Sequence, residues 1–206
     1  SGAILGAAIG DAMGCPTEFL SMSQIEKRYG ANGVTGFVLY KEADGKRFAP
    51  YTDDTQLAEM VLISLLAERN DLNRCMEIMG HNFIQWSNNP QGGHRAPGRA
   101  CLQGCANLAQ GIHWSIAGGQ QAGGCGSVMR SYPFGLVFCN DLDKAEQWAV
   151  AHSYLTHRDP IALAACAAMA IGTAMAIQQC AVKDILNAMA KASARYSQET
   201  AYMINQ

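Results

Sequence analysis

Four consecutive oxygen-bearing side chains, Thr52-Asp53-Asp54-Thr55, stand where an apolar helical pattern begins. Carboxylate and hydroxyl oxygens are the ligands that hard divalent cations such as Mg²⁺ prefer, usually with waters or substrate oxygens completing the shell. Adjacent aspartates at a helix start repel each other, and a bound cation would relieve that repulsion. Asp and Thr are also ordinary capping residues, so a surface helix cap remains the alternative for this cluster.

A glycine-rich stretch, Gly123-Gly124-Cys125-Gly126, runs into Ser127, where a second helix is expected to begin. Backbone N–H groups freed by glycine and aimed from a helix N-terminus suit a phosphate or pyrophosphate. The spacing fits neither the phosphate loop of nucleotide triphosphatases nor the dinucleotide fingerprint, and no strand precedes it. A plain glycine loop is therefore the alternative.

A third polar stretch, Thr156-His157-Arg158-Asp159-Pro160, lies at an expected junction between two helices. A His and an Arg there can hydrogen-bond phosphate or ribose oxygens, and the planar guanidinium favours such contacts. The alternative is local, with Asp159 capping the next helix and His157 satisfied within the turn.

Two acids, Asp11 and Glu18, lie around the end of a glycine-rich first helix. A carboxylate in such a position can orient a sugar hydroxyl or a water molecule. An ordinary surface acid is the alternative for each.

The chain has eight cysteines, most of them inside apolar stretches. Cys101 and Cys105 lie four residues apart on one expected helix, a spacing that could hold a soft metal, but no second pair at zinc-site spacing occurs. We interpret the cysteines as buried thiols in a reducing cytosol, which predicts a cytoplasmic protein.

Apolar residues recur at helical spacing almost everywhere, so the sequence predicts an all-α, compact multi-helix protein. The expected helices are Ala3–Met13, Ser23–Tyr29, Asp53–Arg69, Leu72–Ser87, Gly98–Gln110, Ser127–Phe138, Leu142–Thr156, Pro160–Gln178 and Val182–Ile204. Val34–Leu39 is the one stretch with the character of a strand. With 206 residues and 49% hydrophobic composition, a single domain over residues 1–206 is expected.

Charge and hydropathy exclude some classes of partner. The formal net charge is -2, from 15 basic and 17 acidic residues that are scattered along the chain, so no nucleic-acid partner is expected. The alanine-rich run Ile161–Ile177 is interrupted by Cys, Gly and Thr and is expected to fall short of a membrane span. We therefore expect a soluble protein without a membrane partner, and the sequence leaves its oligomeric state open.

Together these stretches resemble the ADP-ribosylglycohydrolase family, which includes ADP-ribosyl-acceptor hydrolases and dinitrogenase reductase-activating glycohydrolase. The resemblance lies in order as well as content: Gly10-Asp11-Ala12-Met13-Gly14 with Glu18, then Thr52-Asp53-Asp54-Thr55, then the Gly-Cys-Gly-Ser-Val-Met-Arg run that ends at Arg130, then Thr156-His157-Arg158-Asp159-Pro160. Four ordered motifs are specific where each alone is not.

The resemblance implies an all-helical fold with a cleft that holds two Mg²⁺ or Mn²⁺ ions. It also implies hydrolysis of the N- or O-glycosidic bond between ADP-ribose and an acceptor, such as an arginine or serine side chain or a small molecule. The protein is thus expected to be a metal-dependent hydrolase that reverses ADP-ribosylation, with an ADP-ribosylated protein or small molecule as its substrate.

By motif match, the resemblance makes Thr52, Asp53 and Asp54 metal ligands, with Asp53 and Asp54 also catalytic. It makes Glu18 a catalytic residue beside the reacting ribose. It assigns contacts with substrate to Asp11, Gly124, Cys125, Gly126, Ser127, Met129 and His157, with the loop backbone and Met129 on phosphate and ribose and His157 on the diphosphate side.

The chain departs from the family at its C-terminal end. The family completes its two-metal site with an Asp-Thr-Asp-Thr stretch, whereas the only acidic residue beyond Asp184 is Glu199. The resemblance therefore covers the N-terminal two thirds or so of a family member, and the C-terminal metal-binding segment is expected to be lacking.

Two functions stay open on the sequence. One is an ADP-ribosyl-acceptor hydrolase of which this chain forms most of the domain. The other is a shortened, catalytically inactive relative that binds ADP-ribose or a protein partner.

Overall fold

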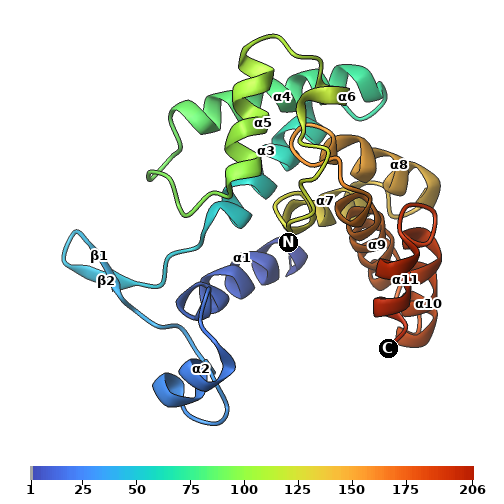
Figure 1. The fold of residues 1–206 in the computed structure, drawn as a ribbon. Helices are drawn as coiled ribbons and strands as arrows, with labels where there is room; N and C mark the ends of the chain where they lie inside the picture. Colours follow the sequence, from blue (N-terminus) through green and yellow to red (C-terminus); the bar gives the residue numbers. More distant parts are fainter. Residues whose placement is uncertain (1) are drawn as a thin grey trace. The chain divides into compact units, whose positions relative to one another are not determined.

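The computed structural model describes residues 2–206, and nearly all regular structure in that range is helical (Figure 1). The helices are α1 Gly2–Gly14, α2 Met22–Tyr29, α3 Asp53–Ala67, α4 Leu72–Asn88, α5 Arg99–Ala109, α6 Trp114–Ala117, α7 Tyr132–Val137, α8 Leu142–Ser153, α9 Pro160–Ile177, α10 Val182–Ser193 and α11 Gln198–Ile204, with 3₁₀ turns η1 Cys15–Thr17 and η2 Val128–Arg130. The sheet in this range is a two-stranded hairpin. The prediction of an all-α protein is confirmed.

The chain forms two compact units, Ser1–Gln56 and Leu57–Gln206, and the division falls inside α3 after its first turn. The prediction of a single domain over residues 1–206 stays a prediction.

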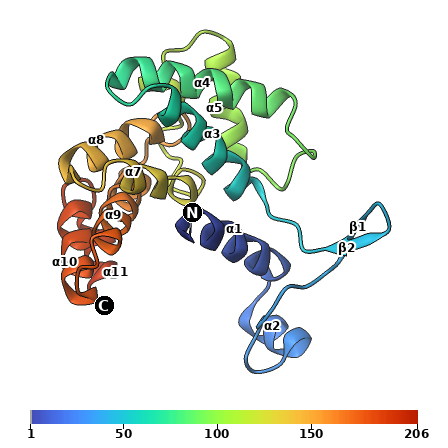
Figure 2. The same ribbon diagram turned by 180° about the vertical axis from the view of Figure 1, so that it is seen from behind.

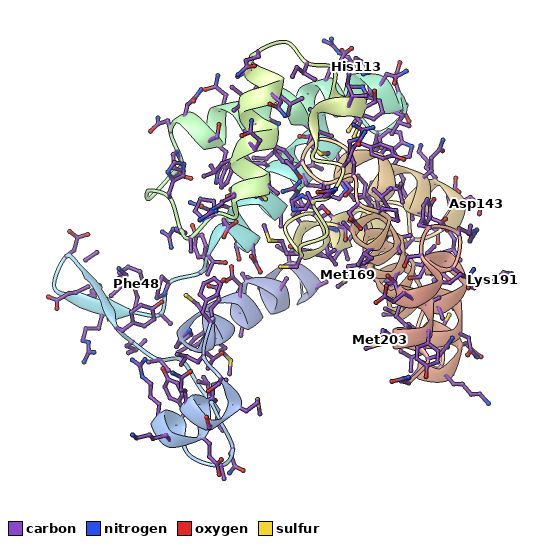
Figure 3. The ribbon with its side chains drawn as sticks, in the orientation of Figure 1. Phe48, His113, Asp143, Met169, Lys191 and Met203 are labelled. Atoms are coloured by element: carbon purple, nitrogen blue, oxygen red, sulfur yellow. The ribbon has the colours of Figure 1, made fainter. Side chains whose placement is uncertain are left out.

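The first unit contains α1, η1, α2 and the hairpin. Its strands, β1 Lys41–Ala43 and β2 Lys46–Phe48, are antiparallel, with Lys41 opposite Phe48 (Figure 3). Asp44 and Gly45 both have positive φ, 51° and 71°, which is the backbone that a two-residue hairpin turn requires. The strand expected at Val34–Leu39 was wrong, because that segment has no partner and pairing begins only beside the Asp44-Gly45 turn.

In the second unit α9 is the central helix, flanked by α8 and α10 and crossed by α7 (Figures 1 and 2). Small side chains permit this packing, because a Cβ added at Gly135 of α7 would meet the α9 backbone around Ala170 and Ala174. A second group of helices, α4 and α5, packs together in the same unit. The main core is formed mainly by residues of α3, α4, α5, α7 and α8 and includes Leu57, Val61, Leu65, Met76, Met79, Phe83, Cys101, Cys105, Phe134, Trp148 and, just after α8, Leu155.

One property of α9 corrects the sequence analysis. Pro160–Ile177 has 18 residues and a mean hydropathy of 2.0, so by length and composition it is long and apolar enough to cross a membrane. In the structure 56% of this segment is buried against its neighbours, as in the core helix of a globular protein. Its length and composition are therefore weak grounds for a membrane span.

The helix expected at Ser127–Phe138 is interrupted. The structure has η2 over Val128–Arg130 and α7 over Tyr132–Val137 instead. Pro133 explains the break, because proline lacks an N–H and suits the first turn of a new helix rather than the interior of an old one.

The helix expected at Val182–Ile204 is also two helices, α10 and α11. Ser197 lies between them and its side chain accepts a hydrogen bond from the Thr200 backbone N–H at 3.2 Å, so it caps a new helix. The short helix α6, with His113 at its N-cap (Figure 3), was not expected. Most other helix ends agree with expectation to within a turn.

Candidate functional site

The start of α3 is built as a cluster of oxygen atoms. The Thr52 hydroxyl accepts the Asp54 backbone N–H at 3.2 Å and so caps the helix. Thr52 and Asp53 are 7% and 6% exposed, and Asp54 is partly buried. The alternative of a surface cap therefore does not describe this helix start, since its polar side chains are largely withdrawn from solvent.

Asp11 of α1 holds that helix start in place. Its two carboxylate oxygens accept the Thr52 backbone N–H at 3.0 and 2.9 Å. One of the same oxygens also accepts the Thr55 backbone N–H at 3.1 Å and the Thr55 hydroxyl at 2.6 Å. Asp11 thus positions the backbone of the cluster, and its expected contact with substrate stays a prediction.

Negative charge is concentrated around Asp54. Burial raises the pKa of its carboxyl above the ordinary value, and the charge of Asp11 raises it further. A hydrogen bond with Thr52 acts in the opposite direction, and the exposed Glu18 adds a smaller upward contribution. A cation at this position would relieve the repulsion among the three acids.

The donor set suits a hard divalent cation in chemistry and falls short in number. Thr52, Asp53 and Asp54 offer hydroxyl and carboxylate oxygens, the ligand types of Mg²⁺ and Mn²⁺. Within residues 2–206 no group of three or more His, Cys, Asp or Glu side chains is arranged to hold a metal ion. These residues therefore fit part of a coordination shell.

A second polar cluster lies in the second unit, where the loop before η2 meets the end of α8. The Gly118 N–H donates to the Tyr154 carbonyl at 2.8 Å, and the Gly119 N–H donates to the Thr156 carbonyl at 3.2 Å. The Arg158 N–H returns a bond to the Gly119 carbonyl at 2.9 Å. The glycine-rich loop is thereby fixed against the segment that carries His157.

Gly126 lies directly against the His157 ring. A Cβ at Gly126 would be 2.7 Å from the Cys101 sulfur and 3.0 Å from His157 Nε2, so only glycine fits without displacement. Two residues before it, Gly124 has nothing within 4 Å of a Cβ position and is exposed. The structure thus brings Gly126 and His157 together and leaves Gly124 and Cys125 accessible.

Ser127 is fully buried, and Met129 is partly buried. The Ser127 hydroxyl accepts from the Ser153 hydroxyl at 2.8 Å and from the Cys166 thiol at 3.3 Å, and its side chain is fully buried. Met129 packs against the main core. The Ser127 hydroxyl is therefore occupied, and only the backbone of this residue could contact a ligand.

The anion site expected at a helix N-terminus needs correction. The loop leads into η2, a 3₁₀ turn of three residues, rather than into a long helix. So short an element carries little of the dipole that makes the end of a long helix attractive to phosphate. Attraction for an anion in this cluster must come from side chains and loop backbone.

A buried arginine is the feature that sequence reasoning missed. Arg130 has no exposed surface; it donates to the Thr156 hydroxyl at 2.6 Å and to the Cys101 sulfur at 3.5 Å, and its guanidinium lies 4.5 Å from the centre of the Phe83 ring. No carboxylate forms an ion pair with it among residues 2–206. The available signal was a single arginine within an otherwise uncharged run of residues 115–140.

His157 is uncharged at neutral pH. Burial lowers the pKa of its imidazole to about 4, helped by the Arg130 cation. Its Nδ1 lies 2.7 Å from the Thr156 hydroxyl. His157 can therefore serve as a neutral hydrogen-bonding group.

The expected cysteine environment holds only in part. Cys101 and Cys105 are each 1% exposed, and burial raises the pKa of the Cys105 thiol to about 11. All eight cysteines are free. Cys125 is exposed, which corrects the expectation of burial for this residue.

Residues 1–205 match the sequence model of the ADP-ribosylglycohydrolase family. The chain belongs to the ADP-ribosylglycohydrolase family. Over 175 residues it is 31% identical to an uncharacterised protein of Archaeoglobus fulgidus, covering 83% of this chain and 53% of that protein. Over 167 residues it is 28% identical to the ADP-ribosyl-[dinitrogen reductase] glycohydrolase of Rhodospirillum rubrum, covering 80% of this chain and 53% of that protein.

The family assignment covers both polar clusters, and the resemblance seen in the sequence is confirmed. The chain spans about half the length of the curated relatives it matches. In this ADP-ribosylglycohydrolase-family chain, the first unit carries the predicted residues Asp11, Glu18, Thr52, Asp53 and Asp54, and the second unit carries Gly124, Cys125, Gly126, Ser127, Met129 and His157. Their individual roles stay predictions.

Proposed function

We propose that the protein is a metal-dependent hydrolase that releases ADP-ribose from an ADP-ribosylated acceptor by cleaving the glycosidic bond. The acceptor would be a protein side chain such as arginine or serine, or a small molecule. Membership of the ADP-ribosylglycohydrolase family supports this reaction class.

The observation that carries the proposal is the arrangement at the start of α3. The two oxygens of Asp11 accept from the backbone N–H groups of Thr52 and Thr55 and from the Thr55 hydroxyl. This geometry holds the side chains of Thr52, Asp53 and Asp54 on one helix turn, and the crowding of acids there favours a cation. A helix cap alone needs no second carboxylate directed at its backbone.

We propose Mg²⁺ or Mn²⁺ as the cofactor, held on this side by Thr52, Asp53 and Asp54, with two ions in a complete site. A divalent cation supplies polarisation of a ribose hydroxyl and favours the orientation of a water molecule. Only part of a coordination shell lies in this cluster.

The chain's own residues would do the remaining work of hydrolysis. Glu18 carries an exposed carboxylate close enough to Asp54 to affect its pKa, so it belongs to the same electrostatic environment. As a general base it would take a proton from water while the water oxygen bonds to the anomeric carbon, and that proton would pass to the departing acceptor. The loop at Gly124–Gly126 and His157 would bind the diphosphate and ribose.

The test is release of ADP-ribose from ADP-ribosyl-arginine and ADP-ribosyl-serine peptides, with Mg²⁺ and with a chelator. We expect metal-dependent release that Asp53→Asn reduces by at least about 100-fold, since a charged metal ligand is lost. The matched control is Asp71→Asn, which changes an exposed aspartate at the N-terminus of α4 and should leave the rate unchanged. Equal loss in both variants would contradict a specific role for Asp53.

The incomplete ligand set of the first cluster favours a second candidate function, that of an inactive relative that binds ADP-ribose or a protein partner. The same experiment separates the two. Binding of ADP-ribose without release from either peptide, at any Mg²⁺ or Mn²⁺ concentration, would favour the binding protein.

We also propose that the protein works in a reducing compartment such as the cytoplasm. All eight cysteines are free, and none of them forms a disulfide. Fractionation of cells that express the protein would test this directly.

A further inference from the structure

Arg130 is a fully buried cation without an ion-pair partner in residues 2–206. Burying a charge is costly unless other groups compensate it. Its compensation comes from the Thr156 hydroxyl, the Cys101 sulfur and the face of the Phe83 ring, and its Nε atom has no hydrogen-bond partner. Such an arrangement leaves a net positive potential beneath the loop that carries Gly126.

The hydrogen bonds of Thr156 have a defined direction. A guanidinium can only donate, so the Thr156 oxygen accepts from Arg130 Nη2 across 2.6 Å. The remaining partner of that oxygen is His157 Nδ1 at 2.7 Å, and the hydroxyl is fully buried. All groups are satisfied only when the Thr156 hydroxyl donates its proton to Nδ1.

This direction fixes the state of the imidazole. With Nδ1 as acceptor, a neutral His157 carries its proton on Nε2. Nε2 lies 3.0 Å from where a Cβ would stand on Gly126, so this N–H faces the glycine loop. The residue as a whole is 2% exposed, so little of it meets bulk water.

We propose that Arg130 is a positioning residue which, through Thr156, holds His157 as a neutral Nε2–H donor for a diphosphate oxygen of ADP-ribose at the Gly124–Gly126 loop. The inference rests on the proposed function and deepens it. The buried cation contributes long-range attraction for the anion, and His157 contributes the directional hydrogen bond.

The first test uses the free protein. Two-bond ¹H–¹⁵N spectra of ¹⁵N-histidine-labelled protein at pH 7 should show His157 as the Nε2–H tautomer. Thr156→Val removes the donor to Nδ1 and should give a mixture of tautomers, whereas Thr156→Ser should keep the original one. Thr173→Val, which alters a threonine of α9 bonded to the Met169 carbonyl, is the matched control and should change nothing.

Arg130→Met gives an independent test that does not depend on Thr156. Replacing an unpaired buried charge with an apolar side chain of similar length should preserve folding. Without Arg130 the Thr156 oxygen loses its donor, so a bond from Nδ1–H would satisfy an acceptor that donation to Nδ1 leaves open, and the Nδ1–H tautomer should appear. An unchanged Nε2–H tautomer in a folded Arg130→Met protein would overturn the proposal.

The second test is the affinity for free ADP-ribose, measured by calorimetry. Loss of one oriented donor should weaken binding about tenfold in Thr156→Val, and Thr156→Ser should restore it. Full affinity in Thr156→Val would overturn the positioning role. Should the wild-type protein show the expected tautomers but no binding of ADP-ribose, the proposed function would fail and the hydrogen-bond relay would stand.

Discussion

Asp11 and Thr52 are joined by a bifurcated hydrogen bond, in which the Thr52 backbone N–H donates to both carboxylate oxygens of Asp11, at 3.0 and 2.9 Å. The two residues are 41 positions apart in the chain. An acid of α1 thus fixes the backbone at the start of α3, which carries the oxygen ligands proposed for the metal.

This contact predicts a specific effect of Asp11→Asn. The new amide would place an NH₂ group where an oxygen now faces N–H and O–H donors from Thr52 and Thr55, so at least one bond must be lost. We expect a loss of about 1–2 kcal/mol in the local stability of the first turn of α3, measured as roughly tenfold faster amide exchange at Thr55.

Asp71→Asn is the control for that substitution. The Asp71 side chain accepts a hydrogen bond from the Arg74 backbone N–H at 3.0 Å, and asparagine caps helices as well as aspartate. Similar exchange changes in both variants would contradict the special role of Asp11.

The glycine loop offers a matched pair of substitutions. Gly126→Ala places a methyl group within 3.0 Å of the Cys101 sulfur and His157 Nε2, so we expect a loss of about 1–3 kcal/mol in unfolding free energy. Gly124→Ala meets nothing within 4 Å and should change stability by less than about 0.5 kcal/mol. Urea unfolding of the two variants checks both values, and equal stabilities would refute the close contact.

Glu146 of α8 connects to the segment after α10 through an ion pair in which the Glu146 side chain is largely buried and the Arg195 side chain is half exposed. Its carboxylate lies 2.9 Å from Arg195 and accepts the Tyr196 hydroxyl at 3.1 Å. Burial raises the pKa of Glu146 despite both partners, so removing Arg195 leaves a poorly compensated charge.

We therefore expect Arg195→Ala to cost about 1–3 kcal/mol in thermal or urea unfolding. The exposed pair of Arg74 and Glu77, separated by 3.6 Å, is the control, and Arg74→Ala should cost less than about 0.5 kcal/mol. A double-mutant cycle between Arg195 and Glu146 should give a coupling energy clearly above that of the exposed pair.

Two buried histidines predict a pH dependence of stability. Burial and Arg130 lower the pKa of His152 well below 6.5 and that of His157 to about 4. At a pH between the lowered pKa of each folded histidine and 6.5, the unfolded chain binds a proton that the folded protein does not. The unfolding free energy should therefore be highest above about pH 6.5 and fall as the pH is lowered toward 4.

For His157 the loss at pH 5 should be about 1–2 kcal/mol relative to pH 7. His157→Gln should make the decline shallower between pH 7 and 5, and the exposed His81→Gln should leave it unchanged. A wild-type stability that is flat across this range would contradict the buried, uncharged state of both rings.

The sequence predicted the helical architecture well, because long helices in this chain have apolar periodicity and recognisable ends. Asp159 followed by Pro160 marks the start of α9, and Asp71 marks the start of α4. Interruptions were harder to see. Pro133 and Ser197 restart helices inside stretches whose apolar pattern continues unbroken, so periodicity alone could not show the breaks.

For the site, residue types indicated the chemistry, while their partners depended on the fold. The oxygen cluster at Thr52–Asp54 could be recognised locally, whereas its support by Asp11 depends on a contact between distant segments. Arg130 was part of a recognised motif, yet its burial beside Thr156 became visible only in three dimensions.

The small residues of α9 have a consequence for how this protein can vary. Its neighbours approach so closely that Ala162, Ala164, Cys166, Ala167 and Ala170 have almost no exposed surface. Selection at these positions acts on volume more than on hydrophobicity, because leucine would be as apolar as alanine but has no room. In a complete substitution library, most positions of α9 should reject large apolar residues as strongly as charged ones. Tolerance should recur about once per helical turn, at Ile161, Ala165, Met169 and Thr173, which keep some exposed surface.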